Sequence, residues 1–171
     1  MSQSNPLRQK RRLRRPSERS ASCTLIFSVV SQITTGRKMA DDPLFLTRQM
    51  VDGIHENAIA AYGGLRGVLN EHLLESAINQ PRHTYHIGGG DIYEIAAAYA
   101  FHIVADHPYW DGNKRTGVGS ALVFLEMNGI DTSELPEMAT FECLIQVADH
   151  RMDRRTLGNF FRTALAGSTP P

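Results

Sequence analysis

The sequence predicts an all-helical (all-α) domain, and three observations support this fold class. From Thr47 onward, apolar residues recur at helical spacing in several segments, which begin at capping residues and end at glycine or proline. Strict alternation of apolar and polar residues, which is typical of a half-buried strand, appears nowhere over a useful length. No internal repeat with a period of about 20–50 residues is visible. A sheet larger than one hairpin is therefore not expected.

Two helices are expected at the start of this domain. Thr47 can cap the first helix, and Gly63 and Gly64 end it. Its apolar face is expected to contain Met50, Val51, Ile54, Ala58 and Ala61. Asn70 can cap a second, shorter helix, which Pro81 closes because proline disfavours the helical conformation of the residue before it. The apolar face of this second helix is expected to contain Leu73, Leu74, Ala77 and Ile78.

A loop and a third helix follow. Residues 81–90 are expected to form the loop, since Gly88, Gly89 and Gly90 lie within them. Asp91 and Glu94 are three positions apart and form a capping box at the start of the third helix. The apolar face of this helix is expected to contain Ile92, Ile95, Ala96, Tyr99 and Ile103. Pro108 interrupts the helix.

Three more helices are expected after a turn at residues 111–112. The first of these ends at Gly129 and carries Val118, Ala121, Leu122 and Leu125 on one face. Two further helices follow Pro136, and Asp153 can cap the second of them. Their apolar faces are expected to contain Phe141, Leu144, Ile145 and Ala148 in one case and Leu157, Phe160, Phe161 and Leu165 in the other.

The charges divide the chain into two parts. Residues 1–38 carry nine basic side chains and one acidic one, whereas residues 39–171 carry nine basic and seventeen acidic ones. The basic part contains Pro6, Pro16 and several serines. A segment of this composition cannot bury a core, so it is expected to be disordered. Two interpretations remain open: an extension upstream of a domain at 39–171 that starts at Met39, or an arm that binds nucleic acid.

Composition excludes several classes of protein. Two cysteines, Cys23 and Cys143, are too few for a disulfide framework, and no C-x-x-C spacing suggests zinc or redox chemistry. The apolar run at residues 25–30 is too short for a secretory signal, and no window approaches a membrane span. A reducing, cytoplasmic setting is therefore expected.

The segment from His107 to Arg115 concentrates polar groups between two apolar helices. The first turn of a helix leaves N–H groups unpaired and carries partial positive charge, so it readily binds anions. Gly112 would let a phosphate approach closely. Lys114 and Arg115 place two positive charges at the positive end of the helix dipole, which is unfavourable by itself. An anion with several charges bound beside them would offset this cost. A polyphosphate is the expected ligand.

Two further residues of this segment suit the chemistry of a nucleotide. Asp111 can supply the single carboxylate that Mg²⁺ needs when phosphates and water fill its other positions. His107 can accept a proton from a hydroxyl nucleophile, because histidine ordinarily titrates near neutral pH. Trp110 is expected only to anchor the loop as a partly buried aromatic. A metal site at His102 and Asp106 is less favoured, since no third ligand follows at a suitable spacing.

At these residues the chain resembles the Fic/Doc (Fido) superfamily, whose motif runs H-P-F-x-[DE]-G-N-[GK]-R. Residues 107–115 match throughout, except that Tyr109 replaces phenylalanine. The resemblance extends over about residues 47–165 and is closest to the death-on-curing (Doc) toxins. It implies a compact helical bundle with a central helix–loop–helix active site and a short flap loop or hairpin, here expected at residues 81–90.

The resemblance also implies roles for the individual site residues. His107 would be the general base, Asp111 would hold Mg²⁺, and phosphate would be bound by Gly112, Asn113, Lys114 and Arg115. Lys114 stands where Fic enzymes have a second glycine, and Val118 stands where they have a second arginine. Both differences are shared with Doc, so the nucleotide is expected to bind in the reversed orientation.

The function implied by the resemblance is that of a toxin paired with a short, Phd-like antitoxin. It would transfer phosphate from ATP to a Ser or Thr hydroxyl of a target protein, and the resemblance to Doc implies elongation factor Tu as that target. Two alternatives remain open: a Fic-type AMP transferase, and a non-catalytic binding protein or degenerate toxin. No membrane association is expected, and nucleic acid would be bound only through the basic tail.

Overall fold

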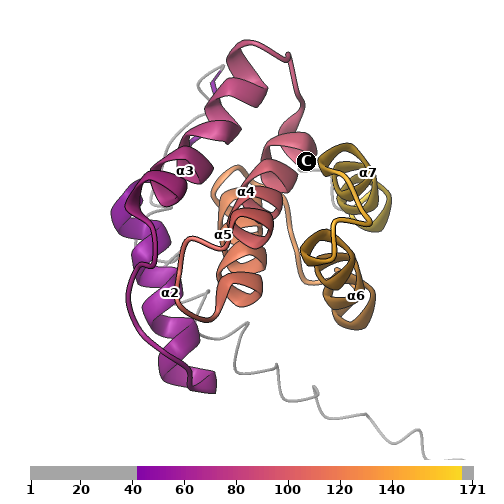
Figure 1. Cartoon of the computed structure of the whole chain (residues 1–171). Helices are drawn as coiled ribbons and strands as arrows, with labels where there is room; N and C mark the ends of the chain where they lie inside the picture. The colour runs from indigo at the N-terminus through magenta and orange to yellow at the C-terminus, as the bar shows by residue number, and fades with distance from the viewer. Residues whose placement is uncertain (1–41, 167–171) are drawn as a thin grey trace, which may run out of the picture.

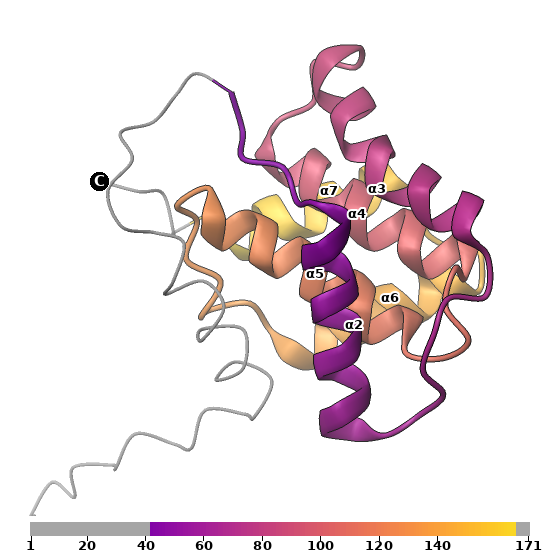
Figure 2. The same ribbon diagram turned by 90° about the vertical axis from the view of Figure 1, so that its left-hand side faces the viewer.

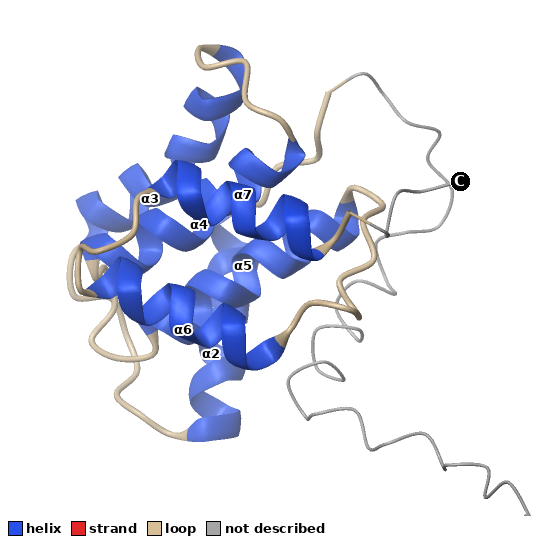
Figure 3. Ribbon diagram, turned by 90° about the vertical axis from the view of Figure 1, so that its right-hand side faces the viewer, coloured by secondary structure: helices blue, strands red, loops and turns tan. Residues whose placement is uncertain are grey.

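The computed structural model describes residues 42–166, and this part of the chain contains six α-helices and no named β-strand (Figure 3). The helices are α2 (Arg48–Tyr62), α3 (Glu71–His86), α4 (Ile92–Asp106), α5 (Asn113–Met127), α6 (Glu137–Ala148) and α7 (Arg154–Ala164). The all-helical prediction is confirmed. The basic segment 1–38 and Met39 lie outside the described residues, so the predicted domain boundary stays a prediction. None of the helices in residues 42–166 is long and apolar enough to cross a membrane.

Helix α4 forms the centre of the bundle. It packs against α3, α5, α6 and α7, while α2 packs mainly against α5. Figure 1 shows α2 and α3 on one side of the α4–α5 pair and α6 and α7 on the other. Five consecutive residues of α4, from Ala96 to Ala100, are fully buried. A helix whose middle is buried on all sides suits a central position, because no face of that stretch must remain polar.

Small residues allow α4 and α5 to approach each other closely. A Cβ atom on Gly117 of α5 would lie 2.7 Å from a methyl group of Val104 and 3.0 Å from the carbonyl oxygen of Ala100. Tyr99 fixes the segment before α2, because its hydroxyl accepts a hydrogen bond from the backbone N–H of Leu46 at 2.9 Å. Burial raises the pKa of Tyr99 to about 12. The core therefore joins α4 to its neighbours by backbone contact as well as by side-chain packing.

Four predicted helix starts are confirmed by their capping hydrogen bonds. Thr47, Asn70 and Asp153 accept from the backbone N–H groups of Met50, Leu73 and Thr156 respectively. Asp91 accepts from two N–H groups at the start of α4, and Glu94 accepts from the N–H of Asp91, which completes the capping box. Each cap involves residues at most three positions apart, so sequence alone was sufficient to find it.

The predicted end of the second helix at Pro81 is wrong, because α3 continues to His86. Pro81 cannot donate a hydrogen bond to the carbonyl of Ala77, and a proline inside a helix costs roughly 3 kcal/mol. The ring is nevertheless buried on the face that packs against α4, where Leu74, Ala77, Ile78 and Thr84 are also buried. Packing outweighs the lost bond, so the loop predicted at residues 81–90 is reduced to residues 87–91.

The predicted apolar face of α2 also needs a correction. Ala61 is exposed, whereas His55 and Ile59 are buried together with Val51. These three residues are four positions apart, so they lie along one stripe of the helix. The pattern of apolar residue types alone excluded His55, although its spacing matches the stripe.

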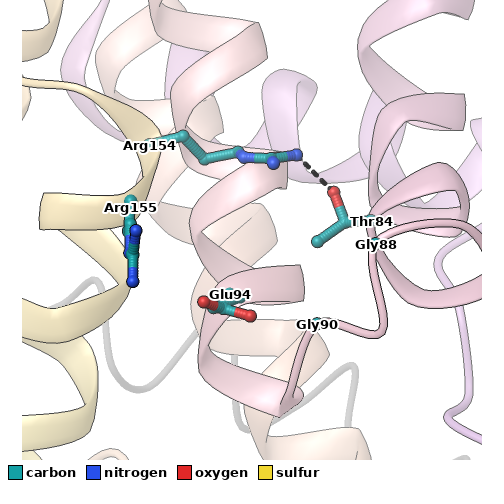
Figure 4. Close-up of a pocket in the computed structure, with 6 residues that line it drawn as sticks. All are labelled: Thr84, Gly88, Gly90, Glu94, Arg154 and Arg155. Carbon is teal, nitrogen blue, oxygen red and sulfur yellow. Dashed lines mark hydrogen bonds between the residues drawn. The ribbon is translucent and has the colours of Figure 1, made fainter.

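A surface pocket lies where α3, α4 and α7 meet. Thr84, Gly88, Gly90, Glu94, Arg154 and Arg155 line it (Figure 4). Arg154 donates a hydrogen bond to the Thr84 hydroxyl and thereby ties α7 to α3. The pocket is near the first turn of α4, so it is at the opposite end of this helix from His107.

Candidate active site

The loop between α4 and α5 places His107 at the end of one helix and Gly112 at the start of the next. His107 has left-handed backbone angles, φ 47° and ψ 55°, as the residue that ends α4. This conformation costs a residue with a side chain roughly 1–2 kcal/mol. The side chain of His107 is exposed, and no other described residue forms a hydrogen bond or ion pair with it. The imidazole is therefore accessible to a ligand.

Asn113 holds the loop in a closed shape. Its side-chain oxygen accepts a hydrogen bond from the Tyr109 N–H at 2.9 Å, and its side-chain nitrogen donates to the Tyr109 carbonyl at 2.8 Å. The Asn113 side chain is buried, as such a pair of bonds requires. A phosphate contact from Asn113 would consequently come from its backbone N–H.

The N-terminus of α5 has no side-chain cap. Gly112 occupies the N-cap position with φ 75°, and the first hydrogen bond of the helix runs from the Thr116 N–H to the Gly112 carbonyl at 2.8 Å. The N–H groups of residues 113–115 therefore have no acceptor four residues earlier within the helix. Lys114 is half-buried beside them and forms no ion pair within residues 42–166. The predicted anion site thus has unpaired donors and an uncommitted cation.

Arg115 and Asp111 connect this turn to the end of α2. Arg115 donates to the carbonyl oxygens of Gly63 at 2.9 Å and Ala58 at 3.3 Å, where a cation stabilises the negative end of the helix dipole. Its other terminal nitrogen lies 3.5 Å from the Asp111 carboxylate. Asp111 also accepts from the Gly112 N–H at 2.5 Å, and a Cβ atom on Gly64 would collide with its second oxygen. Asp111 and Arg115 are each already engaged, in contrast to His107 and Lys114.

The segment that borders the loop is residues 63–70, which join α2 to α3. Backbone N–H groups of Leu69 and Asn70 donate to the Pro108 carbonyl at 2.8 and 3.1 Å, and the Trp110 N–H donates to the Gly67 carbonyl at 3.2 Å. Val68 and Tyr109 form an isolated antiparallel bridge. Figure 2 shows the two loops side by side.

The flap expected at residues 81–90 is therefore wrongly placed. Those residues adjoin the first turn of α4, whereas His107 follows its last turn, and a helix of 15 residues is about 22 Å long. Sequence reasoning favours the longest glycine run, although Gly63, Gly64 and Gly67 mark the segment that does border the site. Only the tertiary fold brings residues 63–70 to the loop.

Two further expectations concern neighbouring residues. Trp110 is less buried than expected of an anchor: it is 59% exposed, although its N–H donates to the Gly67 carbonyl and its ring lies beside that glycine. His102 and Asp106 form a pair with 3.5 Å between Nδ1 and Oδ2. Among the described residues, however, no group of three or more His, Cys, Asp or Glu side chains could hold a metal ion. A protein-only metal site at this pair is not supported.

Comparisons with known proteins agree with this geometry. A model of the Fic/DOC family matches residues 45–125. The chain is 36% identical over 88 residues to "Protein kinase doc" of Escherichia phage P1, a match that covers 50% of this chain and 69% of the relative. It is 34% identical over 97 residues to "Toxin Doc" of Mycolicibacterium smegmatis, covering 48% of this chain and 73% of the relative. The chain belongs to the Fic/DOC family.

In this Fic/DOC member, the tyrosine at the third motif position has a partner that phenylalanine could not use. The Tyr109 ring is buried, and its hydroxyl donates to a carboxylate oxygen of Asp52 on α2 at 3.0 Å. Asp52 also accepts from Arg48 at 2.8 Å, and Arg48 lies 2.8 Å from Glu71 at the start of α3. Burial, followed by the nearby Asp52 charge, raises the pKa of Tyr109, so the hydroxyl stays protonated. The loop is thereby anchored to α2.

Sequence reasoning also missed His55 of α2, which lies beneath the loop. Its side chain is buried, and its Nδ1 lies 3.2 Å from the Thr116 hydroxyl on α5. Its ring stacks on Tyr109 with 3.9 Å between ring centroids. Burial is the main reason that the pKa of His55 is lowered from its ordinary value of 6.5, so the ring is neutral at pH 7. Its position four residues from both Val51 and Ile59 was the signal that could have identified it.

Proposed function

We propose that this chain is a Doc-like toxin that transfers the γ-phosphate of ATP to a Ser or Thr hydroxyl of a target protein, with elongation factor Tu as the expected target. The observation that carries the proposal is the uncapped N-terminus of α5 beside Lys114, with the exposed imidazole of His107 on the same short loop. The relatives named as a Doc kinase and a Doc toxin support this choice. Positioning and charge stabilisation are what a phosphotransferase must supply.

His107 is the proposed general base. Its exposed ring, free of hydrogen bonds to the described residues, can approach a hydroxyl group of a bound protein and accept its proton. The left-handed backbone at His107 turns the chain away from α4, so the ring is presented at the end of the helix instead of along its side. Such local strain at an exposed polar residue is typical of functional sites.

The phosphates are proposed to bind at the first turn of α5. Gly112 brings the backbone close, the N–H groups of Asn113, Lys114 and Arg115 are available as donors, and the Lys114 ammonium supplies positive charge. Arg115 can add charge from its place at the end of α2, although its hydrogen bonds there must be shared or exchanged. Only glycine suits position 112, because its φ is positive and a Cβ atom would lie 3.0 Å from Ile59.

Asp111 is the residue proposed to hold Mg²⁺. Its carboxylate is half-exposed, supplies hard oxygen ligands and directly precedes the uncapped turn, so the residues present fit a magnesium ion shared with phosphate oxygens and water. When bound, Mg²⁺ would neutralise part of the negative charge on the phosphates. The Gly112 N–H donates to one oxygen of this carboxylate, and Arg115 lies 3.5 Å from the same oxygen, so Asp111 is held beside the start of α5.

A Phd-like antitoxin is proposed as the second partner. Large apolar side chains are exposed around the loop and the bordering segment 63–70, namely Tyr62, Leu65, Leu69, Leu73 and Trp110. An amphipathic segment that folds on contact could cover such a surface. Co-expression of such a Phd-like product should restore growth of cells that produce the chain. Growth arrest that persists with that product bound to the chain would contradict this role.

The phosphotransfer is tested with purified protein, labelled ATP and elongation factor Tu. We expect one phosphate on the target, and a His107→Ala variant should be slower by about 10²–10⁴-fold, the usual contribution of a general base. Intact mass distinguishes a phosphate from a whole AMP group, so a gain of AMP would establish the Fic-type reaction instead. Absence of any label transfer, with His107→Ala indistinguishable from the parent, would contradict an enzymatic role.

A further inference from the structure

A single buried imidazole lies beneath the loop and contacts both of its halves. The face of the His55 ring stacks on Tyr109, with 3.9 Å between centroids and 10° between planes. Tyr109 follows His107 by two residues, so this contact supports the part of the loop that presents the proposed base. On the other side, Nδ1 of His55 lies 3.2 Å from the Thr116 hydroxyl in the first turn of α5.

The His55 ring also lies close to Gly112, which belongs to the proposed phosphate site. A Cβ atom on Gly112 would have Cε1 and Nδ1 of His55 as neighbours at 3.6 Å. The imidazole therefore lies directly under the residue at which α5 begins. One side chain thus adjoins Tyr109, Gly112 and Thr116 together.

The polar character of this ring is costly for packing. His55 is 2% exposed, and its Nε2 is buried without a hydrogen-bond partner in the described part of the chain. Burying an unpaired polar nitrogen is unfavourable, whereas an apolar ring of similar size would avoid the penalty. The Nδ1 contact to Thr116 is what an apolar ring could not provide. Because the ring is neutral, it adds no charge beneath the anion site.

We infer that His55 is a positioning residue that joins Tyr109 and the first turn of α5 into one rigid unit. It thereby fixes the spacing between the His107 base and the N–H groups of residues 113–115, which would bind the phosphates. This inference rests on the proposed function. The other end of Tyr109 is fixed by its hydrogen bond to Asp52, so stacking on His55 and bonding to Asp52 hold the aromatic ring from two directions.

Three variants separate the hydrogen bond from the packing. His55→Phe keeps a ring that can stack on Tyr109 but removes both nitrogens. Thr116→Val keeps the shape of the side chain and removes its hydroxyl, whereas Thr116→Ser retains a hydroxyl. We expect His55→Phe and Thr116→Val each to raise the KM for ATP about fivefold and to lower kcat about tenfold. The double variant should lose no more than either single variant, and Thr116→Ser should resemble the parent.

Hydrogen exchange gives a second readout that does not depend on catalysis. In His55→Phe and Thr116→Val, amides in residues 108–116 should exchange faster than in the parent while the rest of the bundle is unchanged. Leu157→Val, at a fully buried position of α7, is the matched control for general loss of stability. It should change neither the KM nor the relative protection of the loop.

The two readouts keep the inference separate from the proposed function. Faster hydrogen exchange of the loop amides in the two variants would support the positioning role, whether or not the parent is active. A parent that transfers no phosphate would refute the phosphotransfer. Parental loop exchange in both variants would overturn the positioning role even if the parent is active. Kinetic losses that match those of Leu157→Val at equal loss of melting temperature would overturn it as well.

Discussion

The two ends of α4 differ in whether their polar groups are hydrogen-bonded within the protein. At the N-terminal end, Asp91 caps the helix, Glu94 completes the capping box, and Arg162 donates to Asp91 at 2.6 Å. At the C-terminal end, His107 is exposed and unpaired among the described residues, and the following helix begins without a side-chain cap. The first end satisfies its donors and acceptors internally, whereas the second leaves His107, Lys114 and the first N–H groups of α5 available for a ligand.

This difference indicates which end of α4 stabilises the fold and which end is suited to bind a ligand. Capping groups that are already paired contribute to stability and have little left to offer a ligand. Uncapped N–H groups and a strained histidine lower stability, and evolution tolerates such features where function needs them. The pocket between α3, α4 and α7 belongs to the first end, where Arg154 is bonded to Thr84.

The largest effect is expected for Gly112→Ala. The positive φ of 75° strains any side chain, and the added methyl group would lie 3.0 Å from Ile59 and 3.6 Å from the His55 ring beneath the loop, so the first turn of α5 would have to shift. We expect a loss of about 1–2 kcal/mol in unfolding free energy together with loss of ATP binding. Urea unfolding and equilibrium titration with ATP measure the two effects.

Gly89→Ala is the matched control for this substitution. Gly89 has a similar φ of 60° near the other end of α4, and a Cβ atom there would meet nothing within 4 Å. A comparable loss of stability with unchanged ATP affinity is expected. If both variants bind ATP as the parent does, the contrast between the two ends of α4 does not hold.

A smaller effect is expected for Asp91→Ala. The substitution removes the side-chain acceptor at the start of α4 and the partner of Arg162, which should cost about 1 kcal/mol of unfolding free energy. Urea unfolding checks the loss, and the KM for ATP should stay at the parental value. A raised KM would show that the capped end also influences the site.

Tyr109→Phe tests the anchoring of the loop to α2. The variant loses the hydrogen bond to Asp52, while Asp52 keeps its bond to Arg48. We expect a loss of roughly 0.5–1.5 kcal/mol in unfolding free energy, with stacking on His55 retained. Denaturant titration measures it. A gain in stability would mean that the buried hydroxyl is a net cost.

The smallest effect is a dependence of stability on pH. Burial lowers the pKa of both His55 and His102 from the ordinary value of 6.5, so the unfolded chain binds more protons below about pH 6.5. Stability is then fully present above this pH and decreases as the pH falls toward the folded-state values. The melting temperature of His55→Phe should therefore fall less than that of the parent between about pH 7.5 and 5.5. An identical fall of the melting temperature in both proteins would contradict the buried, neutral state of His55. His72→Gln, at an exposed position, is the control, and its melting temperature should fall as much as that of the parent.

The sequence alone was sufficient for the helix starts and for the loop of residues 107–115. A cap depends on hydrogen bonds between residues a few positions apart, as at Asp91, and a surplus of polar residues between apolar helices marks a site without any knowledge of the fold. The roles of His107, Asp111 and Lys114 remain proposals, but their segment could be recognised from local pattern alone.

The tertiary structure decided what depends on distant neighbours. Pro81 stays helical because α4 covers it, and residues 63–70 border the site because they bond to the loop. His55 contacts Thr116, which is 61 positions away in the sequence. Helical periodicity relates only residues of the same helix, so it could not predict this contact. Local hydrogen bonds are fixed by neighbours in the chain, whereas burial and long-range contacts exist only once the helices have packed together.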